Sequence, residues 1–309
     1  MVNKLTSIWA PRIFMKLISN SFKRLQHHNP LQIAGATAFF TSFALPPIII
    51  LLFQLLGIFI SRRLIGSRLG EVLTATVGPE GAQQLRDTAK GFRNLAQNWY
   101  MAVLGLLFLI FVATTLFKVV RNTLNDIWNI QLEQSGFIND LKGRGKSLLV
   151  ILTAAILFLV SIMIDIIKVM TGKYIGKLWP EGEVFYTSSL NEIASAVFVI
   201  IWFIVLFRYL GNGRPSWRTS IAGGILTGIL FSLGKTLLST VMKNSNIGAI
   251  YGASGAIVFI LLFVFYSSFI LYFGASFIKE YSLLRGDKII LSKGASLYEL
   301  RKIATDSEK

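Results

Sequence analysis

The chain has no cysteine among its 309 residues, and histidine occurs only twice, at His27 and His28. Without cysteine there is neither a disulfide framework nor a thiolate metal site. Acidic residues are also scarce, at 15 against 31 Lys and Arg. A metal-dependent hydrolase needs clustered His, Asp and Glu ligands, and two adjacent histidines do not make such a cluster. The sequence therefore argues against an enzyme and predicts neither a cofactor nor a metal.

Long apolar runs fill most of the chain. Hydrophobic residues make up 53% and charged residues 15%, and the mean hydropathy is +0.62, whereas soluble domains are about a quarter charged. Residues 33–60 contain no ionisable side chain, and about 20 apolar residues already cross the roughly 30 Å hydrocarbon core of a bilayer. These runs predict a polytopic membrane protein and exclude a soluble one. We expect no nucleic-acid partner, because the basic residues lie mainly between the apolar runs.

The predicted fold is an all-α bundle of six transmembrane helices. The predicted spans are residues 33–60, 99–120, 147–169, 191–210, 218–242 and 255–278. Residues 1–30 are basic, with apolar side chains at helical spacing, and this pattern predicts an interfacial amphipathic helix. Short amphipathic helices are also expected in the loop at 61–98. The predicted organisation is an arm at 1–30, a transmembrane domain at 31–280 and a tail at 281–309.

The distribution of Lys and Arg predicts the topology. The arm, the second and fourth loops and the tail hold twice as many of them as the opposite side, and basic loops face the cytoplasm. Both termini are therefore predicted to be cytoplasmic, although Arg62 and Arg63 follow the first span on the predicted outer side. The same basic excess predicts contact with anionic membrane lipids. The sequence does not determine the oligomeric state, and a homo-oligomer is possible.

A charge inside the membrane costs at least about 2.5 to 3.5 kcal/mol, and the two candidates for a functional charge in the predicted spans are Lys235 and Asp165. Two interpretations of Lys235 are possible. Its long side chain extends along the helix so that the charge reaches the lipid headgroups, or it faces the inside of the bundle and attracts an anionic substrate. Asp165 lies three residues before Lys168, a spacing that favours an ion pair on one helix face, but it is also a candidate partner for Lys235. Glycines around Lys235 predict close helix packing. The packing glycines are Gly224, Gly228, Gly234, Gly252, Gly255 and Gly274.

Polar side chains in the first and sixth spans suggest a path through the bundle. Pro46 and Pro47 lack the amide hydrogen that a helix needs, so they predict a kink or a break in the first span. Unwound backbone at this depth is tolerated only against protein or a water-filled cavity. The other candidate path residues are Thr41, Ser42 and Gln54 of the first span and Tyr266 and Ser267 of the sixth.

Two motifs imitate enzyme signatures. The sequence Gly-Ala-Ser-Gly at 252–255 has the shape of an intramembrane serine protease motif, but a serine needs a base within about 3 Å. Both histidines are predicted on the opposite side of the membrane. Residues 228–236 imitate a phosphate-binding loop with one residue too many between its glycines, inside an apolar helix rather than after a strand. We interpret both as coincidences.

Three stretches together resemble the YihY/virulence factor BrkB family. They are the small-residue and double-aromatic opening at 34–46, the hydroxyl-rich turn and Asn-Asp-Ile-Trp element at 111–128, and the Tyr-Gly-Ala-Ser-Gly-Ala start of the last span at 251–256, which leads to Gly274 and Ala275. The resemblance implies a six-helix bacterial inner-membrane protein with cytoplasmic ends. That family is described as a transporter or exporter of undefined substrate, historically labelled a ribonuclease. Ser276 stands where the family commonly has Glu, so a mechanism that relies on that carboxylate does not carry over.

Two functions of different class fit these observations. The leading hypothesis is transport of an anionic or amphiphilic, lipid-like substrate through a polar path that includes Lys235. The alternative is a membrane scaffold or envelope assembly factor that transports nothing and whose small residues serve helix packing alone. A lysine that faces the bundle favours transport, and a lysine at the lipid surface favours the scaffold.

Overall fold

Helices account for most of the protein in the computed structural model. It describes residues 11–56, 66–67, 70–71, 73–74, 79, 82–87, 90, 99–132, 145, 150, 152–160, 180–244, 255–292 and 294–299. The long helices are α2 (Pro11–Gln26), α3 (Pro30–Leu56), α5 (Trp99–Ile127), α7 (Pro180–Tyr209), α8 (Trp217–Asn244) and α10 (Gly255–Arg285). Four short strands are β1 (Ile130–Leu132), β2 (Gly213–Arg214), β3 (Ile290–Leu291) and β4 (Ala295–Leu297).

Five of the six predicted spans coincide with long helices. Within the described residues, the stretches 217–238 and 257–285 are long and apolar enough to cross a membrane, and 30–45 and 193–209 are shorter apolar helices. The third predicted span, 147–169, is helical at residues 152–160 and otherwise mostly outside the described residues. The number of six spans therefore stays a prediction. The loop at 61–98 is helical at several described positions, among them 82–87.

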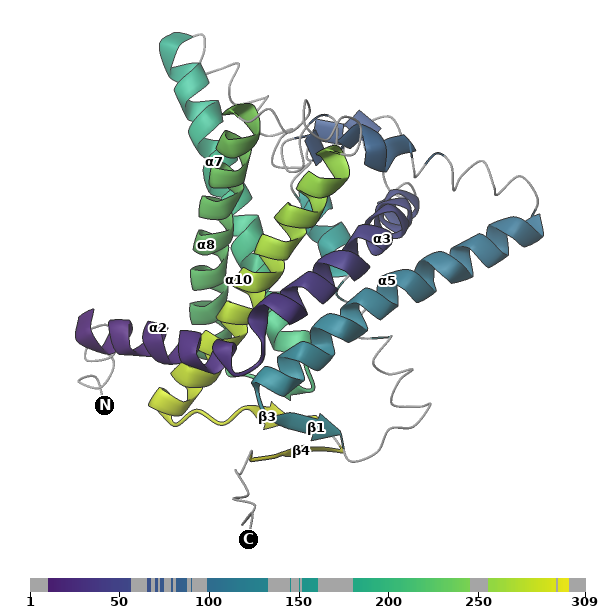
Figure 1. The fold of residues 1–309 in the computed structure, drawn as a ribbon. Helices are drawn as coiled ribbons and strands as arrows, with labels where there is room; N and C mark the ends of the chain where they lie inside the picture. The colour runs from purple at the N-terminus through teal and green to yellow at the C-terminus, as the bar shows by residue number, and fades with distance from the viewer. Residues whose placement is uncertain are drawn as a thin grey trace, which may run out of the picture.

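The first two helices are separated by a turn that the sequence specifies. The backbone of Asn29 is left-handed, with φ of 50°, and asparagine tolerates that conformation better than most residues. Its carbonyl accepts hydrogen bonds from the amides of Gln32 and Ile33. Pro30 occupies the first position of α3, where its missing amide hydrogen costs nothing. The helix then runs without interruption through Pro46 and Pro47, and its ribbon changes direction in its second half (Figure 1).

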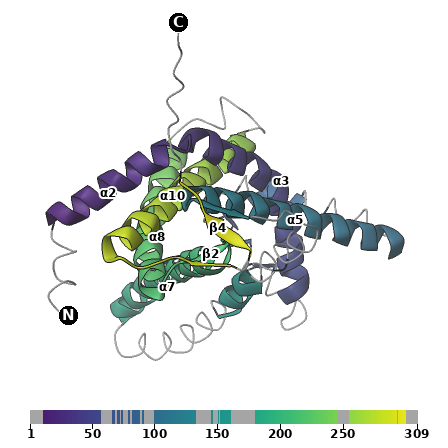
Figure 2. The same cartoon turned by 90° about the horizontal axis from the view of Figure 1, so that it is seen from below.

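The central helix of the bundle is α10. It packs against α2, α3, α5 and α8, while α7 packs on α8 and α3 on α5. The two pairs, α7 with α8 and α3 with α5, lie on opposite sides of α10 and diverge away from one end of the molecule (Figure 1). We call that end the base. Helix α2 crosses the base, and all four strands lie there between the helix ends (Figure 2).

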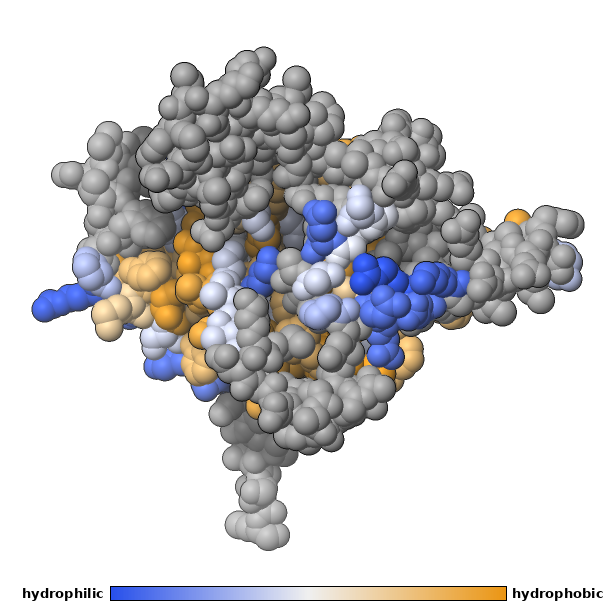
Figure 3. All heavy atoms as spheres, turned by 90° about the horizontal axis from the view of Figure 1, so that it is seen from above, coloured by the Kyte–Doolittle hydropathy of each residue, from blue (hydrophilic) through white to orange (hydrophobic). Residues whose placement is uncertain are grey.

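Two apolar clusters hold the bundle together at different levels. The larger one surrounds Trp128 near the base and joins α2, α3, α5, α7 and α10. The second lies toward the opposite end, where Ala38 of α3 and Phe263 of α10 meet Ala82 and Leu85 of the first loop. Seen from that end, hydrophilic and hydrophobic side chains of the described residues lie next to one another (Figure 3). Both helix pairs therefore pack against α10 and contribute side chains to the same apolar core.

The strands connect distant parts of the chain at the base. Strand β1, which follows α5, pairs antiparallel with β4, and β2, between α7 and α8, pairs antiparallel with β3. Gly286 begins the return from α10 with a φ of 71°. The amides of Gly286 and Asp287 donate to the carbonyls of Leu283 and Ser282, which is a Schellman motif. The segment after α10 thus bridges the ends of both helix pairs.

Candidate functional site

Lys235 lies on the packed side of α8. The exposed side of this helix is a stripe of large apolar residues at every fourth position: Trp217, Ile221, Ile225, Ile229, Leu233, Leu237 and Val241. Lys235 is two residues from both Leu233 and Leu237, which places it about 200° around the helix from each. Its side chain is half-buried. Among the described residues it makes no ion pair or hydrogen bond.

Tyr266 lies in the contact between α8 and α10, against Gly234, the residue before Lys235. Its ring covers Gly234 so closely that a Cβ atom there would overlap it. Its hydroxyl donates to the carbonyl of Leu230, at 2.9 Å. Because the glycine leaves room for the ring, Tyr266 reaches the backbone of the neighbouring helix. Among the predicted residues, the structure therefore brings Tyr266 against Gly234, the neighbour of Lys235 in the sequence.

The other described hydroxyls of the predicted path turn toward their own helices. Thr41 donates to the carbonyl of Thr37 at 2.6 Å, Ser42 to that of Ala38 at 2.9 Å, and Ser267 to that of Phe263 at 2.7 Å. Such bonds satisfy a hydroxyl inside an apolar bundle. The side chains of Asp165, Pro46, Pro47 and Gln54, and the whole of Gly252, lie outside the described residues.

Glycines mark the close contacts of α8 on two sides. Gly224 and Gly228 face Ile204 and Ile200 of α7, where a Cβ at Gly228 would lie 2.5 Å from Ile200 Cγ1. Gly274 of α10 receives the side chain of Thr227. The first residue of α10 is Gly255. Helix α8 therefore fits between α7 and α10 with little side-chain bulk.

A buried hydroxyl network, which the sequence reasoning missed, joins three helices nearer the base. The hydroxyls of Thr37 on α3 and Tyr272 on α10 are 2.5 Å apart, and Thr123 of α5 also hydrogen-bonds Tyr272. Arg121, two residues before Thr123 on α5, is 5% exposed. The signal in the sequence was a Tyr, two Thr and an Arg at helix positions, but only the tertiary structure shows that three of them meet.

Trp128 and Arg24 form a second group at the base that the sequence reasoning missed. The indole Nε1 of Trp128 donates to the carbonyl of Ala275 at 3.0 Å, and Lys279 Nζ donates to the carbonyl of Trp128 at 2.8 Å. Arg24 Nε pairs with Glu280 Oε1 at 2.6 Å. Its Nη1 donates to Asn129 Oδ1 at 3.2 Å. These contacts tie α2, α5 and α10 together at one point.

Titratable groups at the base are shifted by burial. Burial lowers the pKa of His28 below its ordinary value, and the positive charges of Arg24 and His27 act in the same direction. His28 is therefore neutral near pH 7. Burial raises the pKa of Asp126, and burial together with the charge of Asp126 raises that of Tyr298. No three His, Asp or Glu residues come together among the described residues in a way that would hold a metal.

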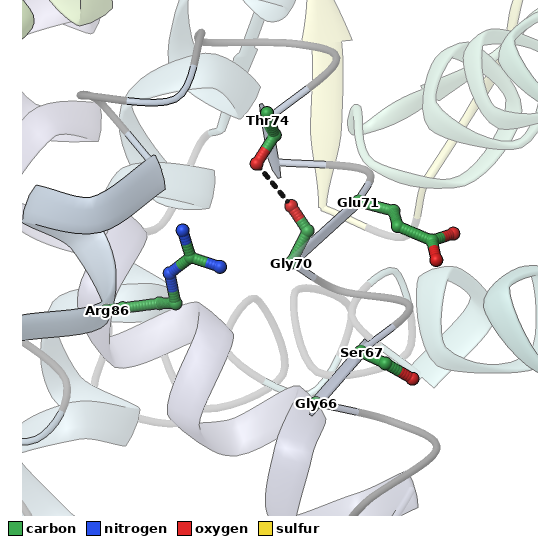
Figure 4. Close-up of a pocket in the computed structure, with 6 residues that line it drawn as sticks. All are labelled: Gly66, Ser67, Gly70, Glu71, Thr74 and Arg86. Atoms are coloured by element: carbon green, nitrogen blue, oxygen red, sulfur yellow. Dashed lines mark hydrogen bonds between the residues drawn. The ribbon is translucent and has the colours of Figure 1, made fainter.

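A pocket of about 520 Å³ lies in the first loop, toward the end opposite the base. It is lined by Gly66, Ser67, Gly70, Glu71, Thr74 and Arg86. The guanidinium of Arg86 extends toward Gly70 and Thr74, whereas the side chains of Glu71 and Ser67 point away from it (Figure 4). The Thr74 hydroxyl donates to the Gly70 carbonyl at 2.7 Å. The lining therefore holds one cation, Arg86, and one carboxylate, Glu71.

Comparison with known proteins gives matches over most of the chain. The family model described as "Virulence factor BrkB" matches residues 21–289. A UPF0761 membrane protein of Haemophilus influenzae is 23% identical over 82% of this chain and 90% of its own length. One from Aggregatibacter aphrophilus is 22% identical over 87% of this chain and 93% of its own length. One from Pseudomonas aeruginosa is 24% identical over 78% of this chain, and the match spans only 57% of that relative. No solved structure gives a significant match.

Proposed function

Because this chain belongs to the virulence factor BrkB family of membrane proteins, we propose that it transports an anionic or amphiphilic, lipid-like substrate across a bacterial inner membrane. The proposed path follows the contact between α8 and α10 and includes Lys235 and Tyr266. In this proposal the base faces the cytoplasm, residues 31–280 form the six-helix transmembrane domain, and Asp165, Pro46, Pro47 and Gln54 complete the path. The relatives' names describe membrane proteins and specify no substrate.

The observation that carries the proposal is the direction of Lys235. A lysine that only anchors α8 in the headgroups would lie on the exposed stripe of that helix, because that is where lipid lies. Lys235 instead occupies the opposite side at the same level. Since a charge inside the bilayer costs at least about 2.5 to 3.5 kcal/mol, its retention on a packed face supports a role for the charge.

The surroundings of Lys235 support an anionic substrate. Leu238, one turn further along the same side of α8, packs on the cluster that includes Ala82 and Leu85. The pocket residue Arg86 follows Leu85 directly. A second cation therefore belongs to the segment packed next to the Lys235 end of α8. Two positive side chains at one end attract an anion before it enters a region of low dielectric constant.

The test compares Lys235→Met with Lys90→Met in purified, reconstituted protein. Methionine keeps most of the lysine stem and removes its charge. Lys90 is exposed in the first loop, so its substitution removes the same charge at the same end without touching the path. The probe is NBD-labelled phosphatidylglycerol, with NBD-phosphatidylcholine as the zwitterionic comparison, and transfer between leaflets is followed by dithionite quenching. We expect wild type and Lys90→Met to transfer the anionic probe and Lys235→Met to lose that transfer at unchanged abundance.

Other outcomes separate the alternatives. If wild-type protein moves neither probe faster than empty liposomes do, lipid transport is wrong and the scaffold is favoured. If Lys235→Met transfers the anionic probe at the wild-type rate, Lys235 has no role in the path. If Lys235→Met fails to fold and Asp165→Asn restores folding, the lysine belongs to a buried ion pair, because a charge that loses its partner inside a protein is strongly destabilising.

A further inference from the structure

The base end of α8 carries a polar and aromatic group directly below its exposed apolar stripe. Trp217, the first residue of the helix, is 51% exposed. Arg208 of α7 lies over its ring, with Cζ 5.1 Å from the ring centroid, and the ring of Tyr209 meets it edge-on at 6.3 Å. Amphipathic aromatic side chains are enriched at the level of lipid headgroups. This corner has the composition of a membrane interface.

The part of the stripe nearest the base has the length and direction of a lipid chain. From Trp217 to Ile229 it spans 12 helical steps, about 18 Å at 1.5 Å per residue, which is close to the roughly 15 Å of one leaflet in a hydrocarbon core of about 30 Å. Ile221, Ile225 and Ile229, its next three members, are all exposed and aliphatic. No charged residue interrupts the stripe itself. An acyl chain that began beside Trp217 would therefore lie along these isoleucines.

Arg218 supplies a free cation at the start of the stripe. Its side chain is exposed, and in the part of the chain that the structure describes it makes no ion pair. It lies about 60° around the helix from Ile221, next to the stripe rather than on the packed side. Arg214 of strand β2 is also exposed at this corner.

Asp287, the nearby acidic residue, forms its described contacts with residues other than Arg218. Asp287 Oδ2 accepts hydrogen bonds from the hydroxyls of Ser216 at 3.0 Å and Thr219 at 3.3 Å. Its other described partner is Arg285 Nε at 3.5 Å. Asp287 therefore stabilises the start of α8 through Ser216 and Thr219. An anion at this corner would be bound by arginine side chains rather than by the backbone amides of the helix.

We propose that this corner binds an anionic phospholipid of the base-side leaflet, with its phosphate at Arg218 and an acyl chain along Ile221, Ile225 and Ile229. The site lies on the outside of the bundle and away from Lys235, so it does not depend on the transport proposal. Charge complementarity selects an anionic headgroup, and the apolar stripe selects a lipid over a soluble phosphate.

Native mass spectrometry of the whole protein, released from nanodiscs that contain equal amounts of phosphatidylglycerol and phosphatidylcholine, tests the proposal. The variant is Arg218→Gln, and the control is Lys90→Gln, which also removes one exposed positive charge, in the first loop. A basic residue near the surface contributes enough to change binding of an anionic lipid about five-fold. We expect Arg218→Gln to retain about five-fold less phosphatidylglycerol, with phosphatidylcholine unchanged and Lys90→Gln equal to wild type.

A second measurement separates lipid binding from a loss of structure. Trp217→Phe keeps an aromatic ring at the corner and removes one tryptophan. We expect brominated phosphatidylglycerol to quench less of the total fluorescence in this variant, because bromine on the acyl chain lies near Trp217. Equal retention of phosphatidylglycerol by Arg218→Gln and wild type would overturn the proposal. Displacement of the bound species by inorganic phosphate would also overturn it, since a soluble ion would then be the ligand.

Discussion

Gly234 and Tyr266 set how closely α8 and α10 approach at the level of the proposed path. Gly234→Ala places a methyl group inside the space of the Tyr266 ring. Overpacking of this kind costs about 1 to 3 kcal/mol, so we expect a lower melting temperature in detergent. In a Tyr266→Ala background the space is open, and there we expect Gly234→Ala to cause little further loss. The melting temperatures of wild type, the two single variants and the double variant form a double-mutant cycle, which measures the coupling between Gly234 and Tyr266.

Gly35 provides the control for that comparison. It also lies in a helix, α3, but a Cβ at this position would meet nothing within 4 Å. Alanine is favoured over glycine inside a helix, so we expect Gly35→Ala to be neutral or slightly stabilising. If Gly234→Ala lowers the melting temperature no more than Gly35→Ala does, Gly234 does not determine how closely α8 approaches α10.

At the scale of elements, the start of α8 depends on a residue from the far end of the chain. Ser216 caps the helix, with its hydroxyl 3.3 Å from the amide of Thr219, and Asp287 places a negative charge beside it. A carboxylate at a helix N-terminus is favourable. Such a charge contributes about 0.3 to 1 kcal/mol, so we expect Asp287→Ala to speed hydrogen exchange in the first turn of α8 by up to about five-fold.

Lys288→Ala is the matched control for Asp287→Ala, because Lys288 is its exposed neighbour. The turn itself is kept in both variants, since the amide and carbonyl of residue 287 make its bonds to Ser282. We expect Lys288→Ala to leave exchange in α8 unchanged. Equal exchange in the two variants would mean that Asp287 does not stabilise the helix start.

The positions of the helices were predictable from the sequence, but their ends were not. Helix α5 continues to Ile127 and α10 to Arg285, each about seven residues past the predicted span. Hydropathy shows where an apolar run stops, whereas these helices continue because their last turns pack at the base. Trp128 and Glu280 lie at those ends and make contacts with residues distant in sequence. Such partners cannot be identified from one sequence.

For the candidate site, the sequence indicates some of the residues but not their arrangement. Lys235 is recognisable because a charge in an apolar run is rare, but its direction required the pattern of exposed residues on α8. Tyr272 is recognisable only as one of many aromatic residues, and its bond to Thr37 depends on how α3 packs against α10. The sequence therefore indicates which residues are unusual, and the structure indicates which of them meet.

At the scale of the whole molecule, the two ends of the bundle differ in construction. The base is cross-connected by Trp128, by the Arg24 and Glu280 pair, and by strands from the end of the chain. At the opposite end the two helix pairs diverge (Figure 1), and loop residues pack between α3, α8 and α10. A transporter with this construction would open more easily at the end away from the base.

The orientation of these two ends in the membrane is the last prediction. Lys16 of α2 and Lys288 after α10 belong to the base, and Gln83 belongs to the first loop at the opposite end. Because basic loops stay in the cytoplasm, we expect a membrane-impermeant maleimide to label Gln83→Cys in spheroplasts. Lys16→Cys and Lys288→Cys should be labelled only after permeabilisation. The chain has no cysteine of its own, so unmodified protein gives the background. Labelling of Lys288→Cys in sealed spheroplasts would reverse the proposed orientation and place the cross-connected base, with its proposed lipid site, in the outer leaflet.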